Sequence, residues 1–358
     1  MRPATIRSSG GALPMDGLTI ELTNACNRRC VHCIRNKADS PEYLPLTLAR
    51  DVLAQTEALG ILTICLTGGE VALYPHLEEI LALVVKHGFT YSLVTNGHRF
   101  QEKIYPLLSV PRNREKLTAV CFSLDGASAD THEALRGPGS FLEVMEAATV
   151  CKLANIPFTL KSFISNFNKA ELTDLAILGA NLGAQDHGFL HPFPSPRLIR
   201  EEVIPSPEEL HRIARQVTGS LAQALKPHIS LEGYGYGPVL FTCHNILHST
   251  NMDYQGNLIL CCNLSHVTQE EGVPSSFGRE WLADLKETSL KEGIIRHFHG
   301  VAQLMEARLR DMEELRGPAY IPCYWCLQHF GKLDWLRDFP GSPWFTGVIE
   351  EESRHARG

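Results

Sequence analysis

The chain has 358 residues, of which 44% are hydrophobic and 20% are charged, and its formal net charge is −7 at pH 7. This length and balance are typical of a globular protein with a sizeable core, long enough for one large α/β domain and a smaller one. The net negative charge gives no general attraction to a phosphate backbone, so we do not expect nucleic acid as a partner.

Residues 1–17 form an N-terminal extension that lacks the apolar core of a signal peptide. No later segment approaches the roughly 18 consecutive apolar residues that a membrane helix needs. Eleven cysteines would suggest a disulfide framework in a small secreted protein, but here several of them stand in short clusters within a long chain. We therefore expect a cytoplasmic protein, not bound to a membrane, whose cysteines hold metal clusters.

From Leu18 to about Ser195, short β-forming runs alternate with helical patterns, which is the signature of a parallel sheet built from βαβ units, and this region is expected to end near Pro227. The expected strands are Leu18–Thr23, Leu62–Thr67, Tyr91–Thr95, Ala119–Leu124, Phe158–Ile164 and His187–His191. Helices are expected at 46–60, 76–88, 140–156 and 206–225, the last opened by a capping box of Ser206 and Glu209.

A later charged segment, 276–316, is also expected to contain a helix. Its apolar residues recur at helical spacing, which indicates a core-facing stripe of Phe298, Val301, Met305, Leu309 and Met312. Residues 336–358 are expected to form a C-terminal tail.

Three cysteines follow the first expected strand, in the spacing Cys-x3-Cys-x2-Cys: Cys26, Cys30 and Cys33. Three thiolates can hold three irons of a 4Fe-4S cluster and leave the fourth iron open to a small molecule. Three close cysteines can also be half of a zinc site, which is the alternative interpretation.

Three more motifs close later strands, namely LTGGE (Gly68, Gly69, Glu70), VTNG (Thr95, Asn96) and FSLDG (Ser123, Asp125). In barrels of parallel strands the chemistry lies at the C-terminal strand ends, where these motifs and the cysteines all lie. Together the four motifs resemble the radical S-adenosylmethionine (SAM) superfamily. The resemblance implies a partial (β/α)6 TIM-like barrel over residues 18–227.

The same resemblance implies that SAM binds at the open iron of the cluster and that one electron cleaves it to a 5'-deoxyadenosyl radical. The electron would come from a donor such as flavodoxin or ferredoxin. The residues implied to contact SAM are Gly68, Gly69, Glu70, Thr95, Asn96, Ser123 and Asp125. Glu70 would receive the SAM amino group, or would only cap a loop. Arg136 would clamp a carboxylate, or would only form a surface ion pair.

Residues 228–335 contain a second cysteine group. Cys243 and Cys261 form the element Cys-x12-Gly-x4-Cys, and Cys323 and Cys326 form a later Cys-x2-Cys. This pattern resembles the Twitch module, a shortened SPASM module that holds one auxiliary 4Fe-4S cluster, so the resemblance implies two clusters in total. A zinc knot is the alternative. Cys262 adjoins Cys261, so the ligand is uncertain by one residue.

Substrate chemistry requires side chains near the mouth of the barrel, and the candidates are Lys161, His187, His191, Glu232 and Cys121. Nothing in the sequence ranks them. Cys121 shares strand parity with Ser123, so both should face the barrel interior if one does. A thiol there could give a hydrogen atom to a substrate radical.

The implied reaction is hydrogen abstraction from an unactivated C–H bond. We expect oxidation of a small metabolite of sugar or aminocyclitol type, with the auxiliary cluster taking an electron, because the second cysteine spacing is similar to that of Twitch-bearing aminocyclitol dehydrogenases. The alternative is crosslinking or epimerisation of a ribosomally made peptide. Many such maturases carry an N-terminal leader-binding domain, whereas only some seventeen residues precede the first expected strand. A non-enzymatic electron carrier would not need a three-cysteine site beside a SAM pocket.

Overall fold

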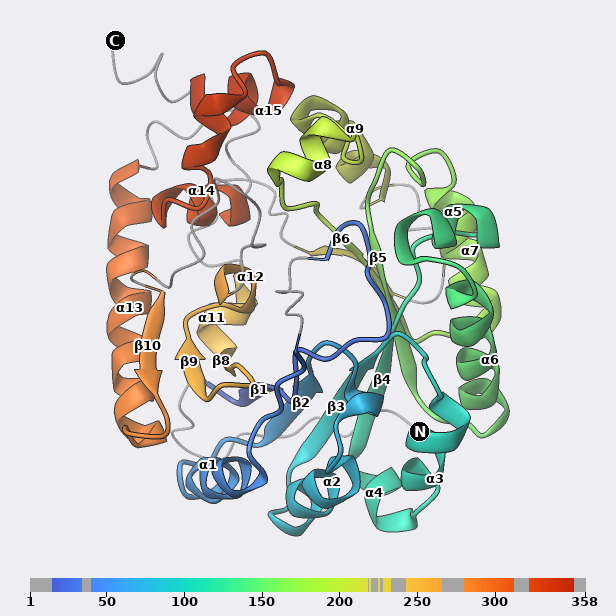
Figure 1. Cartoon of the computed structure of the whole chain (residues 1–358), viewed down its shortest axis with the longest axis vertical. Coiled ribbons are helices and arrows are strands. Elements are labelled where there is room, and N and C mark those ends of the chain that lie inside the picture. Colours follow the sequence, from blue (N-terminus) through green and yellow to red (C-terminus); the bar gives the residue numbers. More distant parts are fainter. Residues whose placement is uncertain are drawn as a thin grey trace.

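Figure 1 shows the computed structural model of the chain, with one curved sheet and helices along its outer side. The structure describes residues 15–33, 40–217, 219, 225, 228–232, 243–265, 278, 280–311 and 322–350. Within these ranges, no helix has the length and apolar character needed to cross a membrane.

The described residues form a sheet of ten strands in the order β10-β9-β8-β1-β2-β3-β4-β5-β6-β7. Neighbouring strands from β1 to β7 are parallel, β8 is parallel to β1, and β9 and β10 are added antiparallel. The strands are β1 (Gly17–Glu21), β2 (Thr63–Thr67), β3 (Thr90–Thr95), β4 (Leu117–Ser123), β5 (Phe158–Phe163), β6 (Asp186–Leu190), β7 (His228–Glu232), β8 (Ser249–Met252), β9 (Asn257–Ile259) and β10 (Trp281–Asp284).

Helices connect the parallel strands and follow the outside of the curved sheet (Figure 1). They are α1 (Leu46–Ala58), α2 (Leu77–Lys86), α3 (Tyr105–Leu108), α4 (Pro111–Lys116), α5 (Ala129–Arg136), α6 (Ser140–Leu153), α7 (Leu172–Leu182), α8 (Pro196–Arg200) and α9 (Pro207–Gln216), with the short helices η1 (Val71–Leu73) and η2 (Phe100–Ile104). The C-terminal part adds α11 (His244–His248), α12 (Cys262–Ser265), α13 (Leu290–Asp311), α14 (Pro322–His329), η5 (Asp334–Asp338), α15 (Pro343–Phe345) and η6 (Thr346–Glu350).

Side chains alternate between two faces along the central strands. On β4, Val120 and Phe122 are completely buried, whereas Cys121 and Ser123 on the other face are only partly buried. The apolar face packs on the helices, because Phe122 meets Phe100 of η2 edge to face with ring centroids 5.3 Å apart. The opposite face is the inside of the partial barrel, and the expected shared orientation of Cys121 and Ser123 is confirmed.

The sheet continues past the six expected strands at both edges. β7 pairs with β6, and β8 pairs with the free edge of β1, so residues assigned from sequence to the C-terminal region complete the same sheet. Neither strand gave a strong signal in the sequence, because each has only four or five residues and few apolar side chains.

The capping box that opens α9 is present as expected, with Ser206 and Glu209 each accepting a backbone hydrogen bond from the other. The predicted stripe on α13 is only partly right. Val301 is buried, but Leu309 is 53% exposed, and Met312 lies outside the described residues. The buried face of α13 instead includes the polar residues His297 and Arg308, which a search for apolar periodicity does not detect.

Candidate functional site

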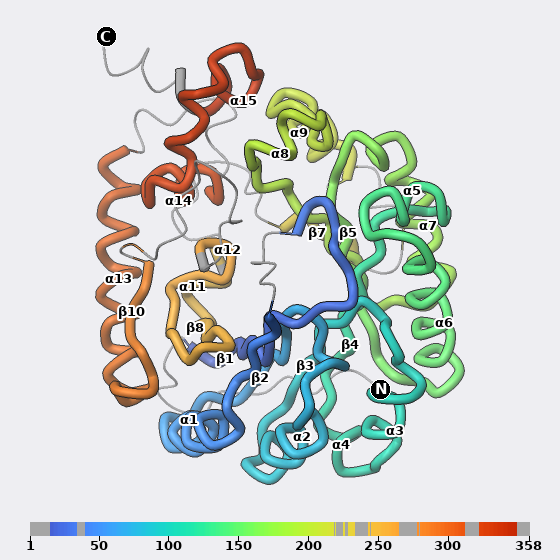
Figure 2. Tube along the Cα trace, viewed as in Figure 1, coloured from blue at the N-terminus to red at the C-terminus, as the bar shows by residue number. Residues whose placement is uncertain are grey.

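The three cysteines lie on the loop that follows β1, and Figure 2 traces this loop across the open side of the sheet. Two contacts hold its far end, because Val31 N–H donates to the Leu135 carbonyl of α5 at 2.9 Å and the His32 ring stacks on Phe163. Cys30 is 8% exposed, whereas Cys26 and Cys33 are more accessible. The loop therefore presents three thiols at the C-terminal ends of the parallel strands.

The Gly68-Gly69 pair packs directly against the cysteine loop. Gly69 N–H donates to the Thr23 carbonyl at 2.6 Å, and Glu70 N–H donates to the Ala25 carbonyl at 2.8 Å. A Cβ atom on Gly69 would lie 2.1 Å from the Ala25 carbonyl oxygen, so only glycine fits there. The two glycines thus allow the backbone after β2 to pack against the backbone of the loop that carries the cysteines.

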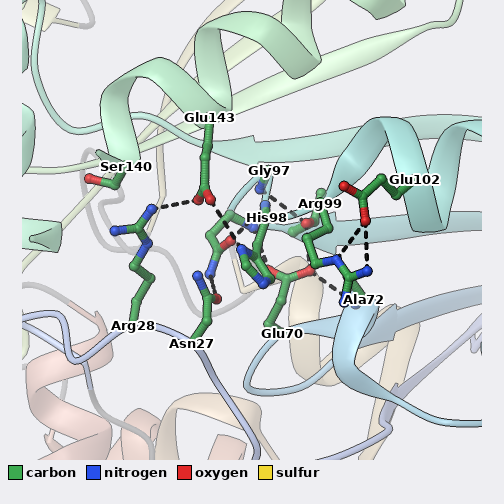
Figure 3. Close-up of polar contacts among 12 residues, drawn as sticks. Asn27, Arg28, Glu70, Ala72, Gly97, His98, Arg99, Glu102, Ser140 and Glu143 are labelled. Atoms are coloured by element: carbon green, nitrogen blue, oxygen red, sulfur yellow. Dashed lines mark hydrogen bonds and ion pairs between the residues drawn. The ribbon is translucent and has the colours of Figure 1, made fainter. Parts of the chain in front are cut away.

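Glu70 is 1% exposed, and Figure 3 shows its carboxylate amid backbone and side-chain donors. Oε1 accepts hydrogen bonds from Ala72 N–H at 3.1 Å and from the Thr95 hydroxyl at 2.6 Å, and Oε2 accepts from Asn96 N–H at 2.7 Å. Burial raises the pKa of Glu70, and these hydrogen bonds oppose that rise. The carboxylate therefore joins the loops after β2 and β3.

Asn96 links this carboxylate to the first cysteine. Its side-chain amide nitrogen lies 3.8 Å from Cys26 Sγ and donates to Asn27 Oδ1 at 2.9 Å. Its Oδ1 accepts from His98 N–H at 2.9 Å. Both the nitrogen and the oxygen of the Asn96 side-chain amide are thus hydrogen-bonded.

A further anchor of the cysteine loop was not found in the sequence. Arg28 Nη2 donates to Glu143 Oε2 of α6 at 2.5 Å, and His98 Nδ1 lies 3.1 Å from Glu143 Oε1 (Figure 3). Arg28 and Glu143 are 115 positions apart, so no spacing rule would have paired them.

Asp125 and Arg136 form a buried ion pair behind Cys30. Arg136 Nε donates to Asp125 Oδ2 at 2.5 Å, and Arg136 Nη1 lies 4.0 Å from Cys30 Sγ. Asp125 Oδ1 also accepts from Phe163 N–H at 2.8 Å. Burial alone would raise the pKa of Asp125, but the neighbouring Arg136 and His32 hold it below its usual range. Arg136 thus pairs with a carboxylate of the protein itself and not at the surface, and its clamping of another carboxylate stays a prediction.

Lys161, Cys121 and Ser123 share the inner face of the sheet, since Ser123 is the register partner of Lys161 and Cys121 that of Thr159. Lys161 forms an ion pair with Glu232 at the end of β7. Burial raises the pKa of Cys121, so its thiol is protonated at neutral pH. The barrel side of the sheet therefore carries Lys161, Cys121, Ser123 and Glu232.

The expectation that His187 lies at the barrel mouth is wrong. Its side chain is completely buried on the outer face, where a Cβ on Gly179 of α7 would come within 2.7 Å of the ring, and its Nε2 lies 2.7 Å from Ser162 Oγ. His191 is 3% exposed, and its ring meets Tyr324 of α14 edge on, with centroids 6.1 Å apart. Burial lowers the pKa of both histidines to about 3, so both are neutral parts of the core.

The second cysteine group gathers around a cavity of about 720 Å³. The cysteines that line it are Cys243, Cys261, Cys262, Cys323 and Cys326. Asn245 Nδ2 lies 3.4 Å from Cys261 Sγ and 3.5 Å from Cys262 Sγ, so both neighbouring thiols reach the cavity and the choice between them stays open. Glu232 lines the same cavity and so connects it to Lys161 inside the barrel.

Both groups suit iron-sulfur clusters by the chemistry of their donors. In the part of the chain that the structure describes, no three Cys, His, Asp or Glu side chains converge on one metal ion. A cubane cluster makes a different demand, because each thiolate binds its own iron and the thiolates stand farther apart than around a single ion. The first group offers three thiols and the second offers at least four.

Comparison with known proteins gives a family match over the barrel. The model described as the radical SAM superfamily matches residues 20–176, which include the first cysteine group and the motifs after β2, β3 and β4. The chain is similar to the AdoMet-dependent heme synthase of Methanosarcina barkeri, with 31% identity over 201 residues, 54% of this chain and 55% of that protein. It is also similar to the mycofactocin maturase MftC of Mycobacterium tuberculosis, with 29% identity over 171 residues, 47% of this chain and 42% of that one.

The chain thus spans about half the length of these curated relatives. Among solved structures it is similar to SuiB of Streptococcus suis bound to SAM, with a TM-score of 0.62 and 12% identity over 78% of this chain and 65% of that one. SuiB bound to its precursor peptide SuiA gives a TM-score of 0.60 and 14% identity over 80% and 67% of the two chains. At this identity the likeness concerns the fold, and the expected α/β partial barrel is confirmed.

Proposed function

This chain belongs to the radical SAM superfamily, and we propose that it cleaves SAM reductively and modifies a ribosomally made peptide. When bound, a 4Fe-4S cluster supplies the electron that splits SAM into methionine and a 5'-deoxyadenosyl radical, which abstracts a substrate hydrogen atom. In this proposal Cys26, Cys30 and Cys33 hold that cluster. The observation that carries it is the contact of the cysteine loop with the buried Glu70 motif and with Asn96.

Glu70 would receive the ammonium of SAM. A carboxylate has about four acceptor positions, and three backbone or hydroxyl donors already occupy Glu70. In this proposal the remaining position accepts from the SAM ammonium, and the existing bonds fix the carboxylate. Thr95 and Asn96 would orient Glu70, and Gly68 and Gly69 would hold it beside the cysteine loop.

Asp125 would act through Arg136 and not by touching the cofactor. Its carboxylate is fully buried and already carries two strong hydrogen bonds, so its role would be to position Arg136 next to Cys30. The inner-face residues Ser123, Cys121 and Lys161 are then the candidates for contact with cofactor or substrate, with Glu232 as the partner of Lys161.

The second cysteine group would hold one auxiliary 4Fe-4S cluster through Cys243, Cys323, Cys326 and either Cys261 or Cys262. Residues 228–335 would then form the auxiliary-cluster unit, although their strands complete the barrel sheet. Two clusters of this kind require a donor such as flavodoxin or ferredoxin and a reducing compartment such as the cytoplasm.

A peptide substrate is favoured over a sugar by the relatives. The similar protein of M. tuberculosis is named a maturase, and SuiB, which has the same fold, has been solved with a precursor peptide. Oxidation of a sugar or aminocyclitol, the first expectation from the sequence, receives less support from these proteins.

The test uses the anaerobically reconstituted protein with dithionite and SAM. Release of 5'-deoxyadenosine, measured by chromatography, is expected for the native chain and not for the variant in which Cys26, Cys30 and Cys33 are all Ala. Continued release by that variant would overturn the proposal. Incubation in deuterated buffer with a synthetic peptide from a short reading frame near the gene should then give a peptide of altered mass, because crosslinking removes hydrogen and epimerisation adds deuterium from an exchangeable donor. Oxidation of an aminocyclitol with no change in any such peptide would favour the metabolite reading.

A further inference from the structure

Arg308 is a buried cation that the proposed function leaves without a role. It lies on α13, is 5% exposed, and lines the cavity of the second cysteine group. Its Nη2 donates to Cys326 Sγ at 2.9 Å and to the Pro322 carbonyl at 3.1 Å. One guanidinium nitrogen therefore holds both the start of α14 and one of its thiols.

The charge of Arg308 lacks a carboxylate partner among the described residues. Nη1 is buried without a hydrogen-bond partner in that part of the chain, and the guanidinium lies over the Trp325 ring with its carbon 5.1 Å from the centroid. A buried guanidinium without a counter-charge is costly, because it has lost its hydration. Glu232 also lines the cavity but pairs with Lys161, whereas Arg308 donates to Cys326. A thiolate cluster on the cysteines is therefore the anionic group placed to balance Arg308 in this part of the chain.

We propose that Arg308 raises the reduction potential of the auxiliary cluster through its hydrogen bond and charge at Cys326. This inference rests on the proposed function, in that it requires a cluster on the second cysteine group. Net charge and hydrogen bonds to cysteine sulfur are main determinants of a cluster's potential. The reduced cluster carries one more negative charge than the oxidised one, so a fixed cation stabilises the reduced form more and favours one-electron uptake.

The geometry of this contact suits the planar guanidinium group of an arginine. The planar guanidinium can donate to Cys326 and Pro322 at once while its face rests on Trp325.

The experiment measures the midpoint potentials of both clusters by redox titration followed by electron paramagnetic resonance, with no substrate present. Arg308→Met removes the charge and the donor, and Arg308→Gln removes the charge but keeps an amide donor. Arg310→Met is the matched control, because Arg310 lies two residues further on α13, is exposed, and among the described residues forms an ion pair with Glu306 one turn away.

We expect Arg308→Met to make reduction of the auxiliary cluster about tenfold less favourable, which is a fall of about 59 mV for a one-electron couple. Arg308→Gln should lower the midpoint potential of the auxiliary cluster less, and Arg310→Met should leave it unchanged. The cluster on the first cysteine group should keep its potential in all three variants. An unchanged auxiliary potential in Arg308→Met would overturn the inference. If that variant lacks the auxiliary cluster, Arg308→Gln decides by the same measurement, and loss of the cluster from both would assign Arg308 a purely structural role.

Iron analysis separates this inference from the proposal on which it rests. Two cubane clusters give about eight irons per native chain. About four irons in the native protein would refute the auxiliary cluster itself, whereas about eight irons with an unmoved potential in Arg308→Met would refute only the role of Arg308.

Discussion

The backbone N–H of Asn96 donates a 2.7 Å hydrogen bond to the buried carboxylate of Glu70. The side chain of the same asparagine lies 3.8 Å from Cys26 Sγ. One residue directly after β3 thus contacts both the carboxylate proposed to bind SAM and the first cysteine of the cysteine loop. Substitutions in this network should separate binding of the cofactor from assembly of the cluster.

Glu70→Gln should weaken SAM binding roughly tenfold to a hundredfold, because it removes a charge-assisted hydrogen bond worth about 1.5–3 kcal/mol. Calorimetric titration of the reconstituted protein with SAM measures this, with iron content determined on the same sample. Glu79→Gln is the control, since Glu79 is exposed and, in the described part of the chain, forms its ion pair with the neighbouring His76. Unchanged SAM affinity with full iron content would leave Glu70 as a loop-capping residue alone.

Asp125→Asn should destabilise the apo-protein by about 3–5 kcal/mol, because it leaves Arg136 buried without its counter-charge. Urea unfolding measures the change. Glu102→Gln breaks an exposed pair with Arg99 instead and should cost less than about 1 kcal/mol. Equal effects of the two changes would mean that the Asp125 site is hydrated in solution.

Cys261→Ala and Cys262→Ala should differ in iron content, because a cubane cluster needs only one of them beside Cys243, Cys323 and Cys326. One variant is expected to keep about eight irons and the other to fall towards about four. The Cys323→Ala, Cys326→Ala double variant should also fall to about four and should still release 5'-deoxyadenosine. Zinc in the native protein in place of the second set of irons would contradict this prediction.

The stability of the protein should fall as the pH drops below about 6.5, partly through His187. Its pKa is lowered by burial to about 3, whereas the unfolded chain takes up that proton near its ordinary value. The unfolded state therefore binds more protons between these values, and stability falls by up to about 1.4 kcal/mol per pH unit for one such group. The contribution of His187 to stability is fully present above its ordinary pKa of about 6.5.

His187→Phe should make this dependence shallower in urea unfolding between about pH 5 and 7, even if it also lowers stability overall by removing the contact with the Ser162 hydroxyl. His132 and His191 have pKa values lowered in the same direction, so part of the slope should persist. An unchanged slope would indicate that the His187 site opens before the protein unfolds.

The positions of the four motifs could be predicted because strand periodicity and turn residues are local. Cys26, Glu70 and Asn96 follow their strands, and Ser123 lies at the end of β4, as expected. The face on which His187 lies could not be predicted, because it depends on the register between β5 and β6, which pairs Gly188 with Lys161 and turns His187 outward. Sequence periodicity alone does not supply that register.

Polar contacts between segments far apart in the chain could not be predicted from the sequence either. Arg28 and Glu143 meet across 115 positions, and Arg308 meets Cys326 from a separate helix. The predicted apolar stripe on α13 omits Arg308, because a hydrophobicity pattern treats every arginine as a surface residue. The Gly68-Gly69 pair was recognised, but that it adjoins the Thr23 and Ala25 backbone required the structure.

The pairing of β8 with β1 has a practical consequence for dissecting the molecule. β1 would be the border of the sheet if the chain were cut before Ser249, and its row of backbone donors and acceptors along Gly17–Ile20 would face solvent. Such a bare border recruits strands from other molecules and promotes insoluble assemblies. The strand that carries the cysteine loop is thus shielded from self-association by a segment more than two hundred residues later in the chain.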